Sequence, residues 1–331
     1  MATKLYPLKF RPIYKYRIWG GNKLKTMLHK HDAPLKCGES WEISAVAKNV
    51  SVVANGFLAD NDIEEIIEVY MGDIVGDAVF EQFGIQFPLL VKFIDATDNL
   101  SIQVHPNDKI AAEKYGQNGK TEMWYIIDAD INSENVTGIK ETVSLDKFDE
   151  LLCKNRIEES LQRESSSAND VFYIPAGRLH AAGKGNLFVE IQQTSDITYR
   201  LHDYDREDSN GMTRDLDITD GFSAIDDSQR GSAKVPYNLQ KNTVVNIIDC
   251  PYFVTNCIEF DRKIIRNYVR LDSFVIYVCT EGKFTIHCEE NLHVETLQRG
   301  ETCLVPAAIN ELELVPATDN VKILEVYIKS N

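Results

Sequence analysis

The chain has 331 residues, of which 44% are hydrophobic, so it is long enough for one large domain or two ordinary ones with a substantial core. Its 51 acidic and 35 basic side chains give a net charge of −16, which excludes broad nucleic-acid binding because no excess of basic surface can displace counterions. The sequence also shows no signal peptide and no stretch of roughly 18 apolar residues that could span a membrane. We therefore expect a cytoplasmic protein that binds neither nucleic acid nor membrane, with its seven scattered cysteines reduced.

Two long segments have the spacing of apolar residues that is typical of helices. The first covers residues 61–85, where Asn61 or Asp62 can act as N-cap and the isoleucines that follow recur at helical intervals. The second covers residues 145–163, with Ser144 as its N-cap. Both helices are expected to be insertions, because the sequence around them has a β pattern.

Strand patterns occupy most of the remaining chain. A short helix over 106–116, ending at Gly116, and a polar connection over 203–240 interrupt them. Strands are expected at 40–44, 49–58, 87–96 and 122–129, from 170 to about 202, and at 252–260, 274–288, 301–307 and 322–329. Many short strands with Gly and Pro turns favour a β-barrel or sandwich, so we predict a large β domain with helical insertions over 1–240 and a smaller all-β domain over 241–331.

Four side chains form a candidate metal site. Gln103 and His105 alternate with apolar neighbours in "SIQVH", so both lie on one face of a strand. Glu122 begins the next strand, and the run "PAGRLH" carries His180 out of a turn. Two imidazoles, a carboxylate and an amide oxygen suit Zn²⁺, although iron, manganese and nickel accept the same ligands. The alternative is a pair of hydrogen-bonded core histidines without a metal.

Unusual charges accompany these residues. Lys92 interrupts the apolar run "PLLVKFI", so it either faces a polar cavity or reaches the solvent from a strand edge. Lys120 precedes Glu122 by two residues and, taken alone, is more typical of a solvated turn. The side chains of Glu190, Gln192, Thr194, Asp196 and Arg200 have one parity, and a continuous strand would place them on one face, lining a pocket or exposed to solvent.

These stretches together resemble the type I mannose-6-phosphate isomerases (phosphomannose isomerases) of the short bacterial kind. The resemblance covers residues 17 to about 206 and extends more loosely to the C-terminal part. The matching motifs are "RIWGGNKL", "GESWEIS", "FPLLVKFIDATDNLSIQVHPND", "GKTEMWYII", "IPAGRLHAAGKG" and "EIQQTSDITYRLHDYDR".

The resemblance implies two cupin domains of jelly-roll-like β-barrel form and a zinc enzyme, with one Zn²⁺ per chain, that interconverts mannose 6-phosphate and fructose 6-phosphate. The second domain is expected to lack a metal, because Glu311 stands where the first domain has its histidine. The family's zinc ligands fall on Gln103, His105, Glu122 and His180, and its active-site residues fall on Lys92, Lys120, Glu190, Asp196 and Arg200.

An aldose–ketose isomerase moves a proton between C1 and C2 through an enediol, so it needs a base near these carbons and positive charge near the oxygens. Lys92, Lys120 and Arg200 could hold the phosphate of a sugar phosphate or stabilise the enediolate. Arg200 and Asp196 are expected near the C1–C2 end, whereas the base stays open between Lys92, Glu190, Asp196 and a metal-bound water.

Two other functions fit the same residues less well. One is a different metal-dependent cupin enzyme such as an iron oxygenase, whose uncharged substrates would not require these basic side chains. The other is a non-catalytic sugar-binding or storage cupin. The oligomeric state is not predicted by the sequence.

Overall fold

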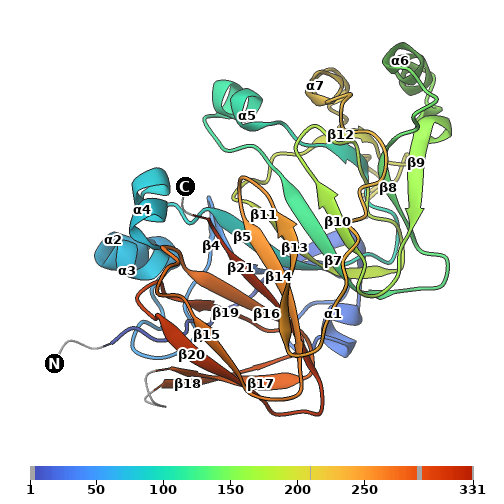
Figure 1. Cartoon of the computed structure of the whole chain (residues 1–331). Helices are drawn as coiled ribbons and strands as arrows, with labels where there is room; N and C mark the ends of the chain where they lie inside the picture. The colour runs from blue at the N-terminus through green and yellow to red at the C-terminus, as the bar shows by residue number, and fades with distance from the viewer. Residues whose placement is uncertain (1–3, 209, 289–292, 330–331) are drawn as a thin grey trace.

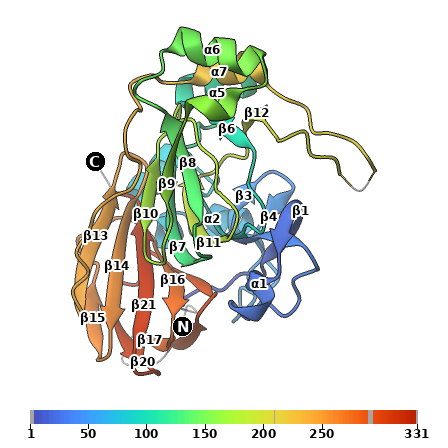
Figure 2. The same cartoon turned by 90° about the vertical axis from the view of Figure 1, so that its right-hand side faces the viewer.

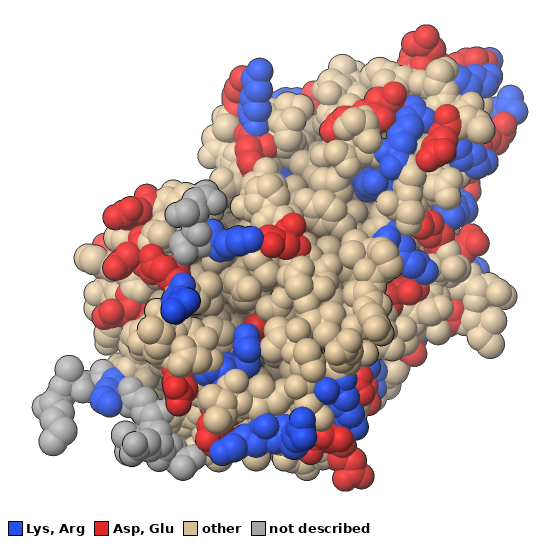
Figure 3. All heavy atoms as spheres, viewed as in Figure 1, with Lys and Arg blue, Asp and Glu red and all other residues tan. Residues whose placement is uncertain are grey.

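The computed structural model describes residues 4–208, 210–288 and 293–329. The chain is mainly β, as predicted, with two β-rich regions beside each other and short helices at the ends (Figure 1). In the described ranges, no helix has the length and apolar character needed to cross a lipid bilayer. On the face seen in Figure 3, the described acidic and basic side chains are interspersed and form no extended basic area.

The first region is built on a six-stranded antiparallel sheet. Its order is β1, β2, β5, β11, β7, β10, with bounds Ile13–Gly21, Cys37–Ile43, Leu89–Asp95, Asn186–Gln193, Glu122–Ala129 and Val171–Ile174. Three smaller pairs complete it: β6 (Ile102–Val104) with β12 (Tyr199–His202), β8 (Glu134–Ile139) with β9 (Leu161–Ser165), and β3 (Ala45–Val46) with β4 (Asn49–Val50). The strand predicted over 49–58 is therefore reduced to two residues.

The second region consists of two antiparallel sheets. One has the order β13, β14, β21, β16, β19 (Thr243–Asp249, Val254–Phe260, Val321–Tyr327, Val275–Glu281, Thr302–Val305). The other has the order β15, β20, β17, β18 (Ile264–Asn267, Glu311–Pro316, Lys283–Cys288, His293–Gln298). Apolar side chains of both sheets share one core, in which the rings of Phe260 and Phe284 lie 5.9 Å apart. No sheet of the described residues closes on itself, so the jelly-roll barrels stay a prediction.

The helix expected over 61–85 begins as predicted but is not continuous. In α2 (Ile63–Tyr70), the side chain of Asp62 accepts a hydrogen bond from the Glu65 amide, and Glu65 accepts one from the Asp62 amide, which is a capping box. Met71 (φ +49°) and Gly76 (φ +94°) then break the chain into α3 (Gly72–Val75) and α4 (Asp77–Phe83). Periodicity alone did not reveal these breaks.

The other helices differ from expectation in extent. The helix α5 (Asp108–Tyr115) ends at left-handed Gly116, as predicted. The helix α6 (Leu145–Cys153) is capped by Ser144, but the prediction that it continues to residue 163 is wrong, because a 3-10 turn (Ile157–Ser160) leads directly into β9. The helix α7 (Ile218–Ala224) lies within the connection 203–240, where none was predicted, and α1 (Lys23–Thr26) is a single turn. Both views place α5, α6 and α7 at the same end of the first region (Figures 1 and 2).

The largest buried cluster contains side chains from both β regions. The fully buried rings of Phe87 and Phe274, which come from the two regions, lie 4.6 Å apart. Leu89 of β5 and Leu304 of β19 belong to the same cluster. The boundary near residue 240 stays a prediction, but this shared core couples the stability of the two regions.

Replacing Phe274 by Ala is expected to lower the free energy of unfolding by about 3–5 kcal/mol, because it opens a cavity in this shared core. Urea unfolding followed by tryptophan fluorescence and circular dichroism should show one transition at a lower midpoint with both probes. Ile265→Ala on exposed β15 is the control, with a change within about 0.5 kcal/mol. Two separate transitions in the Phe274→Ala protein would contradict coupling through this core.

Candidate active site

An open pocket of about 660 Å³ lies against the central strands of the first region. Six of the nine predicted site residues line it: Lys92, Gln103, Lys120, Glu190, Asp196 and Arg200. The other three are the buried residues His105, Glu122 and His180, which lie together and contact Lys120 or one another. The structure therefore brings all nine predicted residues to one place.

The strand assumed to carry the later residues is not continuous. The strand β11 ends at Gln193 and β12 begins at Tyr199, so Asp196 lies in a connection between them. Gln192 donates to the Ser195 carbonyl at 2.6 Å and is not among the pocket residues. Glu190, Asp196 and Arg200 reach the pocket from three different elements. Their shared parity in the sequence is therefore not what brings them together.

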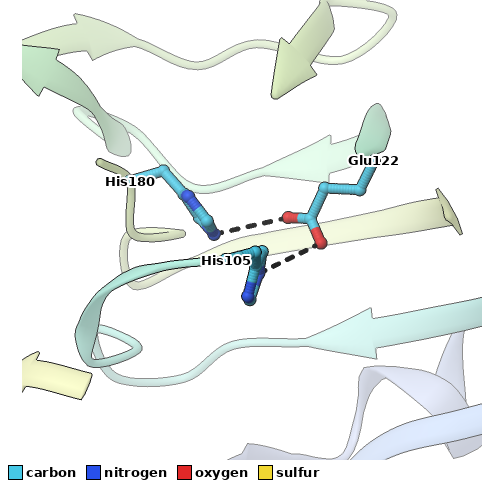
Figure 4. Close-up of side chains that lie close together, drawn as sticks. All are labelled: His105, Glu122 and His180. Carbon is cyan, nitrogen blue, oxygen red and sulfur yellow. Dashed lines mark ion pairs between the residues drawn. The ribbon is translucent and has the colours of Figure 1, made fainter. Parts of the chain in front are cut away.

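His105, Glu122 and His180 form the buried group shown in Figure 4, with one ligand atom of each within 4.8 Å of the others. His105 Nε2 lies 3.4 Å from Glu122 Oε2, and His180 Nε2 lies 3.5 Å from Glu122 Oε1. Burial lowers the pKa of His105 to about 3, with the charge of Lys120 adding to the effect, and burial also lowers the pKa of His180. Both imidazoles are therefore neutral at pH 7, which is the form that binds metals.

The hydrogen bonds of the rings assign the proton to the same nitrogen in both histidines, and Lys120 Nζ lies 3.1 Å from His105 Nε2. His105 Nδ1 lies 3.0 Å from the Ile197 carbonyl, and His180 Nδ1 lies 2.9 Å from the Arg178 carbonyl. A carbonyl only accepts, so each Nδ1 carries the proton and each Nε2 presents a lone pair towards Glu122. His180 Nε2 and Glu122 Oε2 are buried and accept no hydrogen bond within the described residues. The donor set thus fits a metal ion such as Zn²⁺.

Backbone contacts hold the elements that carry these donors. Gln103 and His180 exchange two backbone hydrogen bonds of 2.9 Å, and the side chain of Gln103 lines the pocket. The Gly177 amide donates to the His105 carbonyl at 2.9 Å. Gly177 has φ +86°, and a Cβ there would come within 2.7 Å of Asp226, so the turn before His180 requires glycine.

Glu122 is fully buried, and the groups around it keep it ionised. Burial opposes its charge, but the Lys120 ammonium, 2.8 Å from Oε2, lowers the pKa of Glu122 well below its usual value. Burial in turn opposes the charge of Lys120, but Glu122 and Glu190 raise the pKa of Lys120. Lys120 is therefore a buried, charged lysine, and its interpretation as a solvated turn residue is wrong.

A second buried ion pair lies beside the first. Lys92 and Glu190 are opposite each other on β5 and β11, and their charged atoms are 2.8 Å apart. The Trp124 indole N–H lies 3.0 Å from Glu122 Oε1 and 3.1 Å from Glu190 Oε2, so this ring links the two carboxylates. Sequence reasoning did not identify Trp124, although its position two residues after Glu122 places it on the same face of β7.

The other pocket residues include several that the sequence analysis missed. They are Lys15 and Arg17 on β1, Glu39 and Trp41 on β2, and Arg214. The alternation at the start of "GESWEIS", which sets Glu39 and Trp41 on one face, was the available signal for β2.

Glu39 is held as a charged group in this pocket. It accepts hydrogen bonds from Arg17 Nε at 2.7 Å and from the Trp41 indole at 2.6 Å. Burial would raise its pKa, but the charges of Lys92 and Arg17 outweigh burial and lower the pKa of Glu39 to about 2.

Asp108, at the start of α5, fixes the segment that leads to Glu122. Its Oδ1 accepts hydrogen bonds from the Gly119 amide and from Gln193 Nε2, both at 2.9 Å. Its Oδ2 accepts the hydroxyl of Tyr252, from the second β region, at 2.6 Å. Gln193 in turn accepts the Thr121 amide at 2.8 Å. The two residues that flank Lys120 are thus tied to one carboxylate.

The pKa of Glu39 predicts a contribution to stability that depends on pH. A carboxyl group with a lowered folded pKa stabilises the fold above its unfolded pKa of about 4.3, and this contribution is lost as the pH falls towards 2. Between about pH 5 and pH 2, the free energy of unfolding measured in urea should therefore fall by about 3 kcal/mol less in Glu39→Gln than in the wild type. The exposed Glu113→Gln variant should follow the wild type. Parallel pH profiles for Glu39→Gln and the wild type would contradict the assignment.

Asp108→Ala is expected to lower the free energy of unfolding by about 1–3 kcal/mol, because three hydrogen bonds lose their charged acceptor. Hydrogen exchange at the Gly119 and Thr121 amides should accelerate most. Tyr252→Phe removes only one of the three bonds to Asp108 and leaves both amides paired, so their exchange should stay near the wild-type rate. Unchanged exchange in Asp108→Ala would show that other contacts hold the segment.

Comparison with known proteins agrees with this site. Residues 7–134 match the family model of the phosphomannose isomerase type I catalytic domain. The chain is 32% identical to mannose-6-phosphate isomerase ManA of Bacillus subtilis, with 93% of this chain and 95% of that protein covered. It is 30% identical to mannose-6-phosphate isomerase of Streptococcus mutans, with 95% and 98% covered.

A solved structure extends the agreement to the fold. The crystal structure of the mannose 6-phosphate isomerase from Bacillus subtilis superposes with a TM-score of 0.87 at 29% identity, and the match covers 98% of this chain and all of the other. Sequence similarity over nearly the whole length and the shared fold lead to one conclusion: the chain belongs to the type I phosphomannose isomerase family.

Proposed function

We propose that this protein is a zinc-dependent mannose-6-phosphate isomerase, which interconverts D-mannose 6-phosphate and D-fructose 6-phosphate through an enediol. The relatives named above carry this activity in their names. The observation that supports it most directly is the buried His105, Glu122 and His180 group at the side of a pocket lined by both lysines and arginines. In this proposal the two β regions are cupin domains, and only the first holds a metal.

One Zn²⁺ per chain would be held by His105, Glu122 and His180, with Gln103 as the fourth ligand. Two neutral imidazoles that direct Nε2 at Glu122, an unpaired His180 Nε2 and an ionised, incompletely hydrogen-bonded carboxylate support this choice. The metal, when bound, supplies a Lewis acid that polarises sugar oxygens. An amide and a single carboxylate leave the site with net positive charge, which favours an enediolate.

The charged residues of the pocket then have distinct roles. Lys120 stays protonated beside the metal donors, so it stabilises negative charge that develops on the sugar oxygens. Arg200 lies opposite Gln103 in the β6–β12 pairing and has no carboxylate partner within the described residues, which leaves its guanidinium for substrate. This placement supports the expectation that Arg200 acts near the C1–C2 end.

Among the candidates for the base, the contacts favour Asp196. Glu190 already accepts hydrogen bonds from Lys92 and Trp124, and Lys92 is held in that ion pair. The Asp196 carboxylate lines the pocket, is exposed, and makes no hydrogen bond within the described part of the chain. Its lone pairs are therefore the most available for moving the proton between C1 and C2.

A coupled assay of fructose 6-phosphate formation from mannose 6-phosphate tests the proposal. The zinc-loaded protein should be active, a chelator should abolish the activity, and added Zn²⁺ should restore it. Glu122→Gln should lose both the metal, measured by elemental analysis, and at least about 100-fold in kcat/KM, since removal of a charged ligand leaves the ion weakly held.

The exposed variant Glu113→Gln is the matched control and should retain metal and activity. Oxygen consumption by an iron-loaded sample would instead favour the metal-dependent oxygenase. Sugar binding without turnover in the zinc-loaded protein would favour a non-catalytic cupin.

A further inference from the structure

Three guanidinium groups that line the pocket come from separate parts of the chain. Arg17 lies on β1, Arg200 on β12, and Arg214 in the segment that follows β12. We call these three residues the guanidinium cluster. Each of Arg17 and Arg214 adds to the positive potential at Arg200, since their charges lower the pKa of Arg200 further after burial has lowered it. The three charges are thus near enough to interact, in a protein with a net charge of −16.

The carboxylates around the guanidinium cluster neutralise it only in part. Glu39 accepts a hydrogen bond from Arg17 Nε at 2.7 Å, and Asp217 accepts the Arg200 amide at 3.0 Å. Asp203 pairs with Arg214, at 2.7 Å from Nε, but the same carboxylate also pairs with Arg206. One negative charge therefore serves two arginines. The Arg200 guanidinium donates only to the Ser101 hydroxyl at 3.2 Å and to the Asp215 carbonyl at 3.4 Å within the described residues. The result is a local surplus of positive charge at the pocket wall.

Asp203 also sets the direction of Arg214. The carboxylate holds the guanidinium from one side through Nε and Nη2, which fixes the side chain while the residue still lines the pocket. Asp208, the nearest pocket carboxylate in this segment, accepts the Asn210 and Met212 amides at 2.8 and 3.0 Å, so its charge is engaged within its own turn. A preoriented guanidinium of this kind suits an anion with several oxygens.

The lysines of the pocket are less suited to this task. Lys92 is 2.8 Å from Glu190 and Lys120 is 2.8 Å from Glu122, and all four groups are buried. Binding a phosphate dianion there would place it beside two ionised carboxylates. The metal donors also adjoin Lys120, so this end of the pocket is occupied by the reacting carbons in the proposed function.

We infer that Arg214 binds the phosphate group of the substrate, with the charge of Arg17 nearby, and that Asp203 positions Arg214 for this contact. This inference rests on the proposed function for the identity of the sugar but not for the presence of a phosphate site. The sugar phosphate then lies with its phosphate at Arg214 and its C1–C2 end near Arg200 and the buried His105, Glu122 and His180 group.

Arg206 provides a matched control, because it shares the Asp203 carboxylate with Arg214 but does not line the pocket. Arg214→Gln should raise KM for mannose 6-phosphate at least about tenfold while kcat changes less than about threefold, as expected for the loss of a charge-assisted hydrogen bond. Arg214→Lys should be intermediate, since it keeps the charge and loses the second donor. Arg206→Gln should leave KM unchanged.

Inorganic phosphate is the probe that separates this inference from the proposed function. Isothermal titration of the zinc-loaded proteins with inorganic phosphate should show at least about tenfold weaker binding to Arg214→Gln than to Arg206→Gln or the wild type. Any phosphate bound by the metal contributes equally to all three. Equal phosphate affinities, or an equal loss in Arg206→Gln, would overturn the inference. If the zinc-loaded wild type has no isomerase activity but its affinity for phosphate still depends on Arg214, the proposed function is wrong and the phosphate site stands.

Discussion

The fully buried carboxylate of Glu122 is the feature on which the rest of the site depends. An isolated charge at such a position costs far more free energy than a single hydrogen bond returns, so the fold must surround it with compensating groups. Lys120 supplies an opposite charge and the Trp124 indole supplies a hydrogen bond, whereas the two neutral imidazoles direct lone pairs at the carboxylate and do not compensate its charge. Two donor atoms nevertheless stay without a hydrogen bond within the described residues, and this incomplete satisfaction is what a metal ion would complete.

The antiparallel register of the central strands makes this arrangement possible. On β5, β11 and β7, Lys92 lies opposite Glu190, and Glu190 lies opposite Trp124. Directly opposed side chains point to the same face of a sheet, so a lysine, a carboxylate and an indole form one polar row in an otherwise apolar sheet, and Glu122 lies on the same face two residues before Trp124. A shift of one strand by one residue would point its polar side chains into the apolar core on the other face of the sheet. The hydrophobic residues between them therefore fix the register that the site requires.

Charged side chains are paired in the buried part of the pocket and are less completely paired towards the solvent. Buried lysines and carboxylates pair close to the metal donors, where solvent cannot screen them. Further out, Arg200 keeps its charge without a carboxylate partner in the described chain, and Arg214 shares one with Arg206. Surplus positive charge is tolerated there because the groups are only partly buried, and the same surplus can attract an anionic substrate to an acidic protein.

Local sequence patterns were sufficient to predict that strands predominate, that α2 starts at its Asp62 cap and that α5 ends at Gly116. Each of these features depends on neighbours only a few residues away. The alternation around His105 and the turn before His180 likewise indicated the candidate metal donors, and the quoted motifs were sufficient to indicate the family. Tertiary structure alone decided that the expected helix over 61–85 breaks at Met71 and Gly76 and that β11 and β12 are separate. It also decided that Glu39 and Arg214 join the pocket and that Trp124 links the carboxylates of Glu122 and Glu190. The contact of Asp203 with Arg214 depends on the conformation of a loop. The contact of Lys92 with Glu190, which are 98 residues apart in the sequence, depends on strand register, so no local periodicity encodes either contact.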